Sequence, residues 1–216
     1  MDKYYPIMLN IFGKNCVVIG GGKVAERKVL ALLECGAKVK VISPNSTTRL
    51  KELQREKHIE LIEREYRFGD IKGSFLAFIA TDQRKVNKSC LEEARNEGIL
   101  VNVIDKAEFC DFTVPSVIRR GDLHVTVSTN GKSPMLSKKI REELEEIFGE
   151  EYAAFINALG ALRKIVLKDI EEVYIRRNIF ERIVYSDVLK RYKAGEINNI
   201  KEAVLNLYDD IKKDYR

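Results

Sequence analysis

A glycine-rich turn directly after a short apolar run is the feature that most constrains the fold. Residues 15–19 are apolar after Asn15 and rich in β-branched side chains, which is typical of a central parallel strand. The turn that follows has the pattern G-x-G-x-x-A, with Gly20, Gly22 and Ala25 at the fixed positions. Gly20 permits a sharp turn, Gly22 lets the backbone approach a pyrophosphate, and Ala25 permits close packing of helix on strand. The pattern predicts a dinucleotide-binding turn, and a purely structural turn is the alternative.

Strand-like and helix-like runs alternate through the first half of the chain. The expected strands are short and apolar, and the expected helices are amphipathic. The strands are expected at 15–19, 38–43, 59–62, 74–81 and 99–105, and the helices at 24–35, 46–57 and 82–98. Because right-handed crossovers place helices on both faces of a parallel sheet, this order predicts an α/β fold of the Rossmann type.

The second half of the chain follows a different pattern. Two alternating runs, 112–118 and 123–128, flank a turn at 119–122, which predicts a β-hairpin. Ser133 is expected to cap a helix that has Pro134 at its first position. Further helical stretches are expected from 150 onward, including 173–192 and 200–215. The predicted parts are a Rossmann-like domain at 1–111, a hairpin and helix at 112–149, and a helical domain at 150–216.

Composition argues against several classes of protein. The formal net charge is only +5 and both signs are mixed along the chain, so nucleic acid is not expected as a partner. The four cysteines have neither metal-ligand nor redox spacing, which favours a reduced, cytoplasmic protein. No apolar run approaches the roughly 18 residues that a membrane span requires, and no signal-peptide pattern is visible.

The end of the second strand departs from the usual fingerprint of nicotinamide dinucleotide sites. An acidic residue normally binds the ribose there, but this chain has Ser43 and Pro44. Ser43 is a candidate for a hydrogen bond to a ribose hydroxyl, whereas Lys40 and Arg49 are candidates for attracting a 2′-phosphate. The residues leave NAD and NADP both open, and a plain strand end is a third alternative.

Polar residues at the ends of later strands are candidates for the chemistry. Ligands of open α/β sheets bind at the carboxyl ends of the strands, so Asp105 is the favoured catalytic residue. Thr81 and Asp82 end the fourth strand in the same crevice and are candidates for cofactor contacts, although Asp82 is equally suited to cap the next helix. His124 lies on the polar face of the hairpin, where a solvated strand residue is the main alternative to a catalytic or metal-binding role.

Five motifs in this order resemble the precorrin-2 dehydrogenase family, the N-terminal module of siroheme synthases. They lie at 18–28, 80–82, 101–105, 112–118 and 128–134. The resemblance spans most of residues 1–150 and implies NAD-dependent oxidation of precorrin-2 to sirohydrochlorin, followed in some members by ferrous-ion insertion. It also implies a homodimer built through the hairpin region, and a stand-alone form without a methyltransferase domain.

The same resemblance implies roles for single residues. It makes Asp105 the general base and places cofactor contacts at Gly21, Gly22, Lys23, Val24, Ser43 and Pro44. The substrate is a tetrapyrrole with several carboxylates, and cations or hydroxyls near the hairpin suit it. The expected substrate-binding residues are Arg119, Arg120, His124, Ser128, Lys132 and Ser133. Ordinary solvated residues are the alternative for these cations, and no metal site is recognisable.

A competing hypothesis comes from a different class of protein. Rossmann domains of some regulatory modules bind NAD(H) without performing any chemistry. Such modules usually retain the acidic residue after the second strand, and Ser43 stands in its place here.

Overall fold

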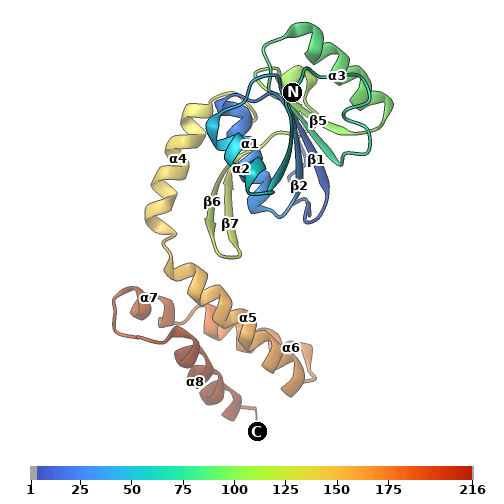
Figure 1. Cartoon of the computed structure of the whole chain (residues 1–216). Helices are drawn as coiled ribbons and strands as arrows, with labels where there is room; N and C mark the ends of the chain where they lie inside the picture. The colour runs from blue at the N-terminus through green and yellow to red at the C-terminus, as the bar shows by residue number, and fades with distance from the viewer. Residues whose placement is uncertain (1–3, 216) are drawn as a thin grey trace. The chain divides into compact units, whose positions relative to one another are not determined.

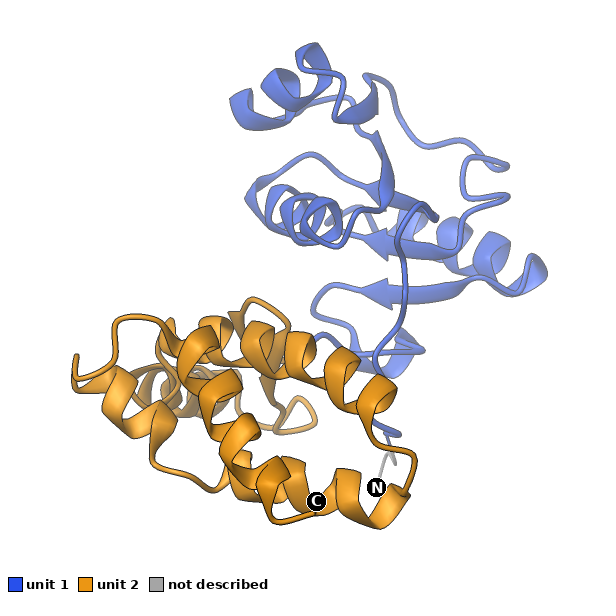
Figure 2. Cartoon of the chain, turned by 90° about the horizontal axis from the view of Figure 1, so that it is seen from below, with its two compact units in different colours: residues 1–114 blue, residues 115–216 orange. Residues whose placement is uncertain are grey.

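The computed structural model describes residues 4–215 and divides the chain into two compact units (Figure 2). The first unit comprises residues 1–114 and the second comprises residues 115–216. The predicted boundary at 111/112 lies close to this division, and the predicted boundary at 149/150 stays a prediction.

The first unit alternates strands and helices as the sequence predicts. Its elements are β1 (Asn15–Ile19), α1 (Lys23–Glu34), β2 (Lys38–Ile42), α2 (Thr48–Arg55), β3 (Ile59–Ile62), β4 (Leu76–Ile79), α3 (Arg84–Asn96), β5 (Leu100–Val103) and the short 3-10 helix η1 (Ala107–Phe109). β4 is buried along its whole length and β1 is buried after Asn15, as central strands of a doubly covered sheet must be. The predicted α/β fold is confirmed.

The strands described in the first unit form one parallel sheet in the order β3-β2-β1-β4-β5. Figure 1 labels β1, β2 and β5 of this sheet. α1 and α2 pack on one face of this sheet and α3 packs on the other. The order of strands reverses at β1, which pairs with β2 on one side and β4 on the other. A ligand crevice forms at the carboxyl ends of parallel strands beside such a reversal. The carboxyl ends of β1 and β4 therefore mark the place of the candidate site.

The start of α3 differs from one expectation. Asp82 was a candidate cap for this helix, but α3 begins at Arg84 and its N-cap residue is Gln83. The prediction for Asp82 as a cap is wrong because the helix begins one residue too late. The hydroxyl of Thr81 instead accepts a hydrogen bond from the backbone N–H of Gln83, at 3.1 Å, and so closes a local turn.

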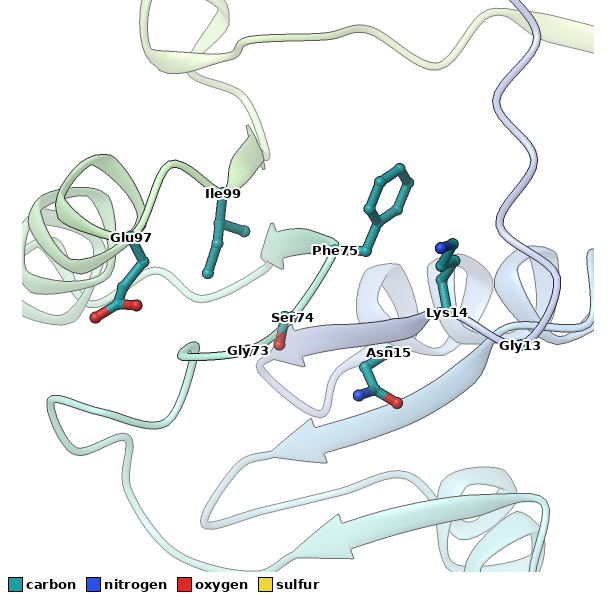
Figure 3. A pocket seen from close by; sticks show the side chains of 8 residues that line it. All are labelled: Gly13, Lys14, Asn15, Gly73, Ser74, Phe75, Glu97 and Ile99. Atoms are coloured by element: carbon teal, nitrogen blue, oxygen red, sulfur yellow. The ribbon is translucent and has the colours of Figure 1, made fainter.

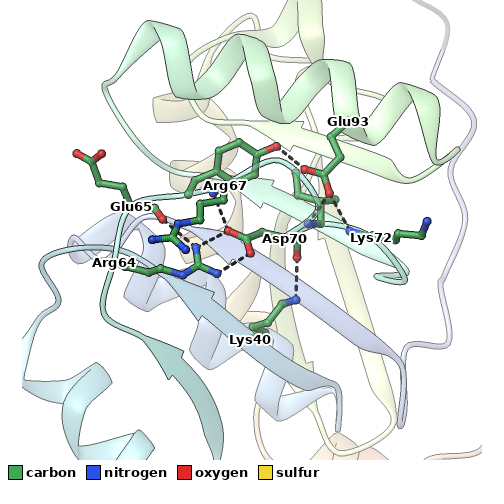
Figure 4. A network of polar contacts seen from close by, with 9 residues as sticks. Lys40, Arg64, Glu65, Arg67, Asp70, Lys72 and Glu93 are labelled. Carbon is green, nitrogen blue, oxygen red and sulfur yellow. Dashed lines mark hydrogen bonds and ion pairs between the residues drawn. The ribbon is translucent and has the colours of Figure 1, made fainter.

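The connection between β3 and β4 is a loop, residues 63–75, held by a polar network (Figure 4). Arg64 forms a bidentate ion pair with Asp70, with N···O distances of 2.7 and 2.8 Å. The buried carboxylate of Glu93 on α3 accepts hydrogen bonds from the backbone N–H groups of Ile71 and Lys72, at 2.7 and 2.9 Å. Glu93 also accepts one from the hydroxyl of Tyr66, and burial together with this bond raises the pKa of Tyr66.

Replacing Glu93 with alanine is expected to lower the free energy of unfolding by about 3 kcal/mol or more. The change leaves two backbone N–H groups and the Tyr66 hydroxyl without their acceptor, and each buried group left unpaired costs ~1–3 kcal/mol. Urea unfolding measures the loss, and Glu92→Ala, at an exposed position on the same helix, is the matched control. Equal stability of the two variants would show that the network does not hold the loop.

The second unit joins a hairpin to a set of helices. Its elements are β6 (Ser116–Arg120), β7 (Leu123–Val127), α4 (Pro134–Ile147), α5 (Glu151–Asp169), α6 (Val173–Val184), α7 (Val188–Lys193) and α8 (Ile200–Lys213). Side chains from α5 to α8 form its buried core. The predicted cap is confirmed, because the Ser133 hydroxyl accepts from the N–H of Leu136 and Pro134 begins the helix.

Two details of the second unit differ from the expectations. Arg119 and Arg120 belong to β6 and not to the turn, because the pairing continues until Arg120 faces Leu123 and only Gly121 and Asp122 connect the strands. Gly121 supplies the positive φ, 57°, that such a tight turn requires.

The helix expected at 173–192 is interrupted at Ser186. The hydroxyl of Ser186 donates to the carbonyl oxygen of Ile183 and accepts from the N–H of Val188, so it takes backbone groups that a continuous helix would use.

Within residues 4–215, the structure contains no helix with the length and apolar character needed to cross a bilayer.

Candidate cofactor and active site

The first glycine of the fingerprint brings β1 and β4 together. Gly20 has a φ of 120°, which side chains rarely adopt. A Cβ atom on Gly20 would lie 2.2 Å from the carbonyl oxygen of Ala80, the residue that follows β4. The N–H of Gly20 also donates to the carbonyl oxygen of Ile42 at the end of β2. The turn therefore lies where the strand order reverses, as the fingerprint predicts.

The next two glycines serve different purposes. A Cβ atom on Gly21 would lie 2.2 Å from the carbonyl oxygen of Asn45 and 2.8 Å from the hydroxyl oxygens of Ser43 and Ser46. A Cβ atom on Gly22 would meet no atom within 4 Å. Gly21 thus lets the turn pack against the loop after β2, whereas Gly22 borders open space. The fingerprint explains Gly22, but it gave no steric reason for Gly21.

The N-terminus of α1 presents backbone donors at this space. Gly22 is its N-cap residue and has no side chain to satisfy them, and the first internal bond runs from the N–H of Glu26 to Gly22. The N–H groups of Lys23, Val24 and Ala25 have no acceptor within the described residues. Unpaired donors at the positive end of a helix dipole bind phosphate, and an open approach at Gly22 admits it. These residues fit the pyrophosphate of a dinucleotide.

The side chain of Lys23 lies beside the same helix. Its ammonium group is 3.1 Å from both carboxylate oxygens of Glu26. Hydrogen bonds from Thr47 and Lys23 lower the pKa of Glu26, so this carboxylate stays ionised. Thr47 is the N-cap residue of α2, and its N–H donates to the carbonyl oxygen of Gly21. The contacts tie the glycine turn to α2.

The loop after β2 contains the two residues that replace the usual acid. Ser43 is buried, and its hydroxyl donates to the carbonyl oxygen of Asn45 at 2.7 Å, so its oxygen can only accept a further hydrogen bond. Pro44 is exposed. The two cations considered for a 2′-phosphate both have partners. Lys40 donates to the carbonyl oxygen of Asp70, and Arg49 pairs with Glu52 of α2 and with the C-cap residue Glu56.

Asp105 lies in a turn directly beyond β5. β5 ends at Val103, and the N–H of Lys106 bonds back to the carbonyl oxygen of Val103 at 3.4 Å. Asp105 has a φ of 59°, a left-handed conformation that aspartate and asparagine adopt more readily than most residues. Its side chain is exposed and forms no hydrogen bond or ion pair within residues 4–215. Unusual backbone conformations of this kind cluster at functional sites.

Cys110 and Asp111 hold the loop that carries Asp105. Asp111 exchanges two hydrogen bonds with Val101, each 2.9 Å long, through its backbone N–H and its carboxylate. The sulfur of Cys110 lies 3.2 Å from the backbone nitrogen and oxygen of Val103. Burial raises the pKa of the Cys110 thiol, which keeps its proton available for donation. The segment that follows the Asp105 turn is therefore held against β5 by bonds to Val101 and Val103.

Two polar atoms at the same edge of the sheet were missed by the sequence analysis. The hydroxyl oxygen of Ser46 and the amide oxygen of Asn87 are enclosed and have no hydrogen-bond partner in the part of the chain that the structure describes. Ser46 lies against Gly21, and the amide nitrogen of Asn87 donates to the carbonyl oxygen of Thr81 at 3.1 Å. Asp82, the residue after Thr81, is exposed. No cofactor-binding motif marks either missed residue.

The residues expected to bind substrate all lie in the second unit. In the hairpin, Arg119 faces His124, and the exposed His124 lies on the polar face that alternation predicts. The side chain of Arg120 is largely enclosed, with its Nε 3.4 Å from a carboxylate oxygen of Glu150. Arg120 therefore ties the hairpin to the residues before α5, and its role toward a substrate stays a prediction.

The remaining substrate candidates shape the loop between β7 and α4. The hydroxyl of Ser128 accepts from the N–H of Asn130, and the hydroxyl of Thr129 accepts from the N–H of Ser133, each at 3.1 Å. Lys132 is exposed, so its ammonium group is open to solvent. The loop is thus an ordered start for α4, and its contacts with a substrate stay predictions.

A shallow hollow of about 390 Å³ lies at the opposite edge of the sheet (Figure 3). It is lined by Gly13, Lys14, Asn15, Gly73, Ser74, Phe75, Glu97 and Ile99, which precede or begin β1, β4 and β5. None of the predicted site residues lines it. Within the described residues, no group of three or more His, Cys, Asp and Glu side chains is placed to hold a metal ion.

Comparison with known proteins agrees with the geometry of the first unit. Residues 7–116 match the protein family described as "Putative NAD(P)-binding". The chain belongs to this NAD(P)-binding family. Residues 120–147 match a second family, described as "Sirohaem biosynthesis protein central". The two matches cover most of the first unit, most of the hairpin and α4.

Relatives of this NAD(P)-binding chain carry the name that the motifs suggested. The siroheme synthase of Nitrosococcus oceani is 35% identical over 194 residues, which are 90% of this chain and 42% of the relative. The siroheme synthase of Photobacterium profundum is 31% identical over 204 residues, which are 94% of this chain and 44% of the relative. The chain spans less than half the length of these relatives. The resemblance to siroheme synthases is confirmed.

A solved structure shares the whole fold. The structure named "SirC, precorrin-2 dehydrogenase" superposes with a TM-score of 0.79 at 22% identity, and covers 96% of this chain and 100% of its own. At this identity the likeness supports the fold, including the hairpin and the helices after it.

Proposed function

We propose that this chain is a dehydrogenase that uses NAD to oxidise precorrin-2 to sirohydrochlorin in siroheme biosynthesis. The observation that carries the proposal lies at the carboxyl edge of one parallel sheet. The open approach at Gly22 and the exposed carboxylate of Asp105, which has no partner within residues 4–215, both lie there. The names of the similar siroheme synthases and of SirC supply the substrate.

The residues of the first unit are proposed to bind NAD and to accept the proton. Bound NAD supplies the acceptor for the hydride that leaves the tetrapyrrole. Asp105 accepts the proton that leaves with this two-electron oxidation, and its position outside the strand ends suits a general base. Cofactor contacts are proposed at Gly20, Gly21, Gly22, Lys23, Val24, Ser43, Pro44, Thr81 and Asp82.

NAD is proposed over NADP because the two cations near the end of β2, Lys40 and Arg49, already have partners. Lys40 donates to the carbonyl oxygen of Asp70, and Arg49 pairs with Glu52 and Glu56. A 2′-phosphate would have to share these cations with their present partners, whereas a ribose hydroxyl needs only the accepting oxygen of Ser43.

The second unit is proposed to bind the carboxylates of the tetrapyrrole and to form a homodimer. Arg119, Arg120 and Lys132 supply cations, and His124, Ser128 and Ser133 supply polar contacts. The cytoplasm remains the predicted compartment. Insertion of a ferrous ion into sirohydrochlorin by this chain stays a prediction of the resemblance.

Anaerobic incubation of the protein with precorrin-2 and NAD tests the proposed function. We expect the absorption of sirohydrochlorin to appear with NAD, to appear far more slowly with NADP, and to be absent without a dinucleotide. Binding of NAD without any product would overturn the enzyme and favour the non-catalytic sensor of NAD(H).

A further inference from the structure

The side-chain amide of Asn87 has a hydrogen-bond partner at its nitrogen but none at its oxygen within the described residues. Its nitrogen donates to the carbonyl oxygen of Thr81, at 3.1 Å. A carbonyl oxygen can only accept, so this bond settles which end of the amide is the nitrogen. The other end is therefore the oxygen, and it is enclosed without a donor within residues 4–215. Enclosed polar atoms of native proteins almost always have a partner, so a missing donor needs an explanation.

The orphaned oxygen lies at the edge where the dinucleotide is proposed to bind. Thr81 comes two residues after the end of β4, and Ala80 between them is the residue that Gly20 approaches. Asn87 stands one turn into α3, and its amide is tied to Thr81 at the carboxyl end of β4. The reversal of strand order between β2, β1 and β4 makes this end one wall of the ligand crevice.

The expected orientation of the dinucleotide places its nicotinamide half at the carboxyl end of β4. The pyrophosphate is placed at the N-terminus of α1, and the ribose of the adenosine half is placed at the loop after β2, beside Ser43. The nicotinamide half must then extend across β1 toward β4. The part of this half that donates hydrogen bonds from an amide nitrogen is the carboxamide of the ring.

We infer that the amide oxygen of Asn87 accepts a hydrogen bond from the carboxamide nitrogen of the nicotinamide. The inference rests on the proposed binding of NAD and names one further residue of that site. Asn87 acts as a positioning residue, because its amide is fixed by Thr81 before the cofactor arrives. Fixing the carboxamide fixes the face of the ring that the substrate meets.

Titration calorimetry with two dinucleotides tests this contact. NAD has the carboxamide NH2 group, and 3-acetylpyridine adenine dinucleotide has a methyl group in its place. The unaltered protein is expected to bind NAD about three- to tenfold more tightly than the analogue, as one hydrogen bond to a neutral partner provides. Asn87→Ala is expected to weaken NAD binding and to abolish this preference. Asn96→Ala, at the exposed far end of α3, is the control and should retain the preference.

The ratio of the two affinities keeps the test valid if Asn87→Ala also lowers stability, because a loss of folded protein affects both dinucleotides equally. An unchanged ratio in Asn87→Ala would overturn the inference, including the case in which both dinucleotides bind more weakly by the same factor. Failure of the unaltered protein to bind NAD at all would overturn the proposed function instead, so the two failures are distinguishable.

Discussion

Replacing Asp105 with asparagine is expected to slow oxidation of precorrin-2 by about 10²–10⁴-fold, the range that a general base contributes. The change removes the proton acceptor and little else, because asparagine also tolerates the φ of 59° at this position. The carboxylate forms no bond within the described chain, so stability should change little. Stopped-flow absorbance of sirohydrochlorin measures the rate, and calorimetry should show NAD affinity close to that of the unaltered protein.

The control for Asp105→Asn is Glu108→Gln, an exposed carboxylate in the same loop. This variant loses one negative charge beside the site but keeps the proposed base, so its rate should stay within a few-fold of the unaltered rate. Equal slowing in both variants would assign the effect to local charge. Full activity of Asp105→Asn would remove Asp105 from the role of base.

Two glycine substitutions are expected to separate folding from cofactor binding. Gly20→Ala places a Cβ atom 2.2 Å from a backbone oxygen at a φ of 120°, and should lower the free energy of unfolding by about 2–5 kcal/mol. Gly22→Ala has a φ of −78° and open space, so its stability should be nearly unchanged. The new methyl group of Gly22→Ala would stand where the pyrophosphate approaches, and NAD affinity should fall at least about tenfold.

Thermal unfolding and NAD titration of the same two preparations check this pair of predictions. Gly22→Ala should melt as the unaltered protein does and bind NAD poorly. A variant with normal NAD affinity at Gly22 would show that the open space beside α1 does not receive the phosphates, and the cofactor site would have to be sought elsewhere.

Periodicity was sufficient to predict the architecture but not the limits of its elements. β1 and β4 are covered on both faces, and burial of this kind leaves continuous apolar runs that are visible in the sequence. β5 was expected to extend to Asp105, because Ile104 continues the apolar pattern. The strand stops at Val103, where a backbone bond and the left-handed φ of Asp105 turn the chain. Such a turn depends on the conformation of single residues, which periodicity does not report.

The candidate site was predictable where it follows a local fingerprint. Gly20 and Gly22 were expected from their spacing, whereas the requirement at Gly21 comes from Asn45, which the fold brings close. Ser46 and Asn87 matter because their oxygens lack partners, and a missing partner is a property of three-dimensional packing. Long-range contacts therefore account for most of what the sequence left out.

The most direct test of the account measures both products of one anaerobic incubation of the protein, precorrin-2 and excess NAD. NADH and sirohydrochlorin should form at the same rate and in equal molar amounts, and neither should form when the protein is left out. Formation of sirohydrochlorin without NADH, or binding of NAD with neither product, would contradict the claim that this sheet edge transfers a hydride from the tetrapyrrole to NAD.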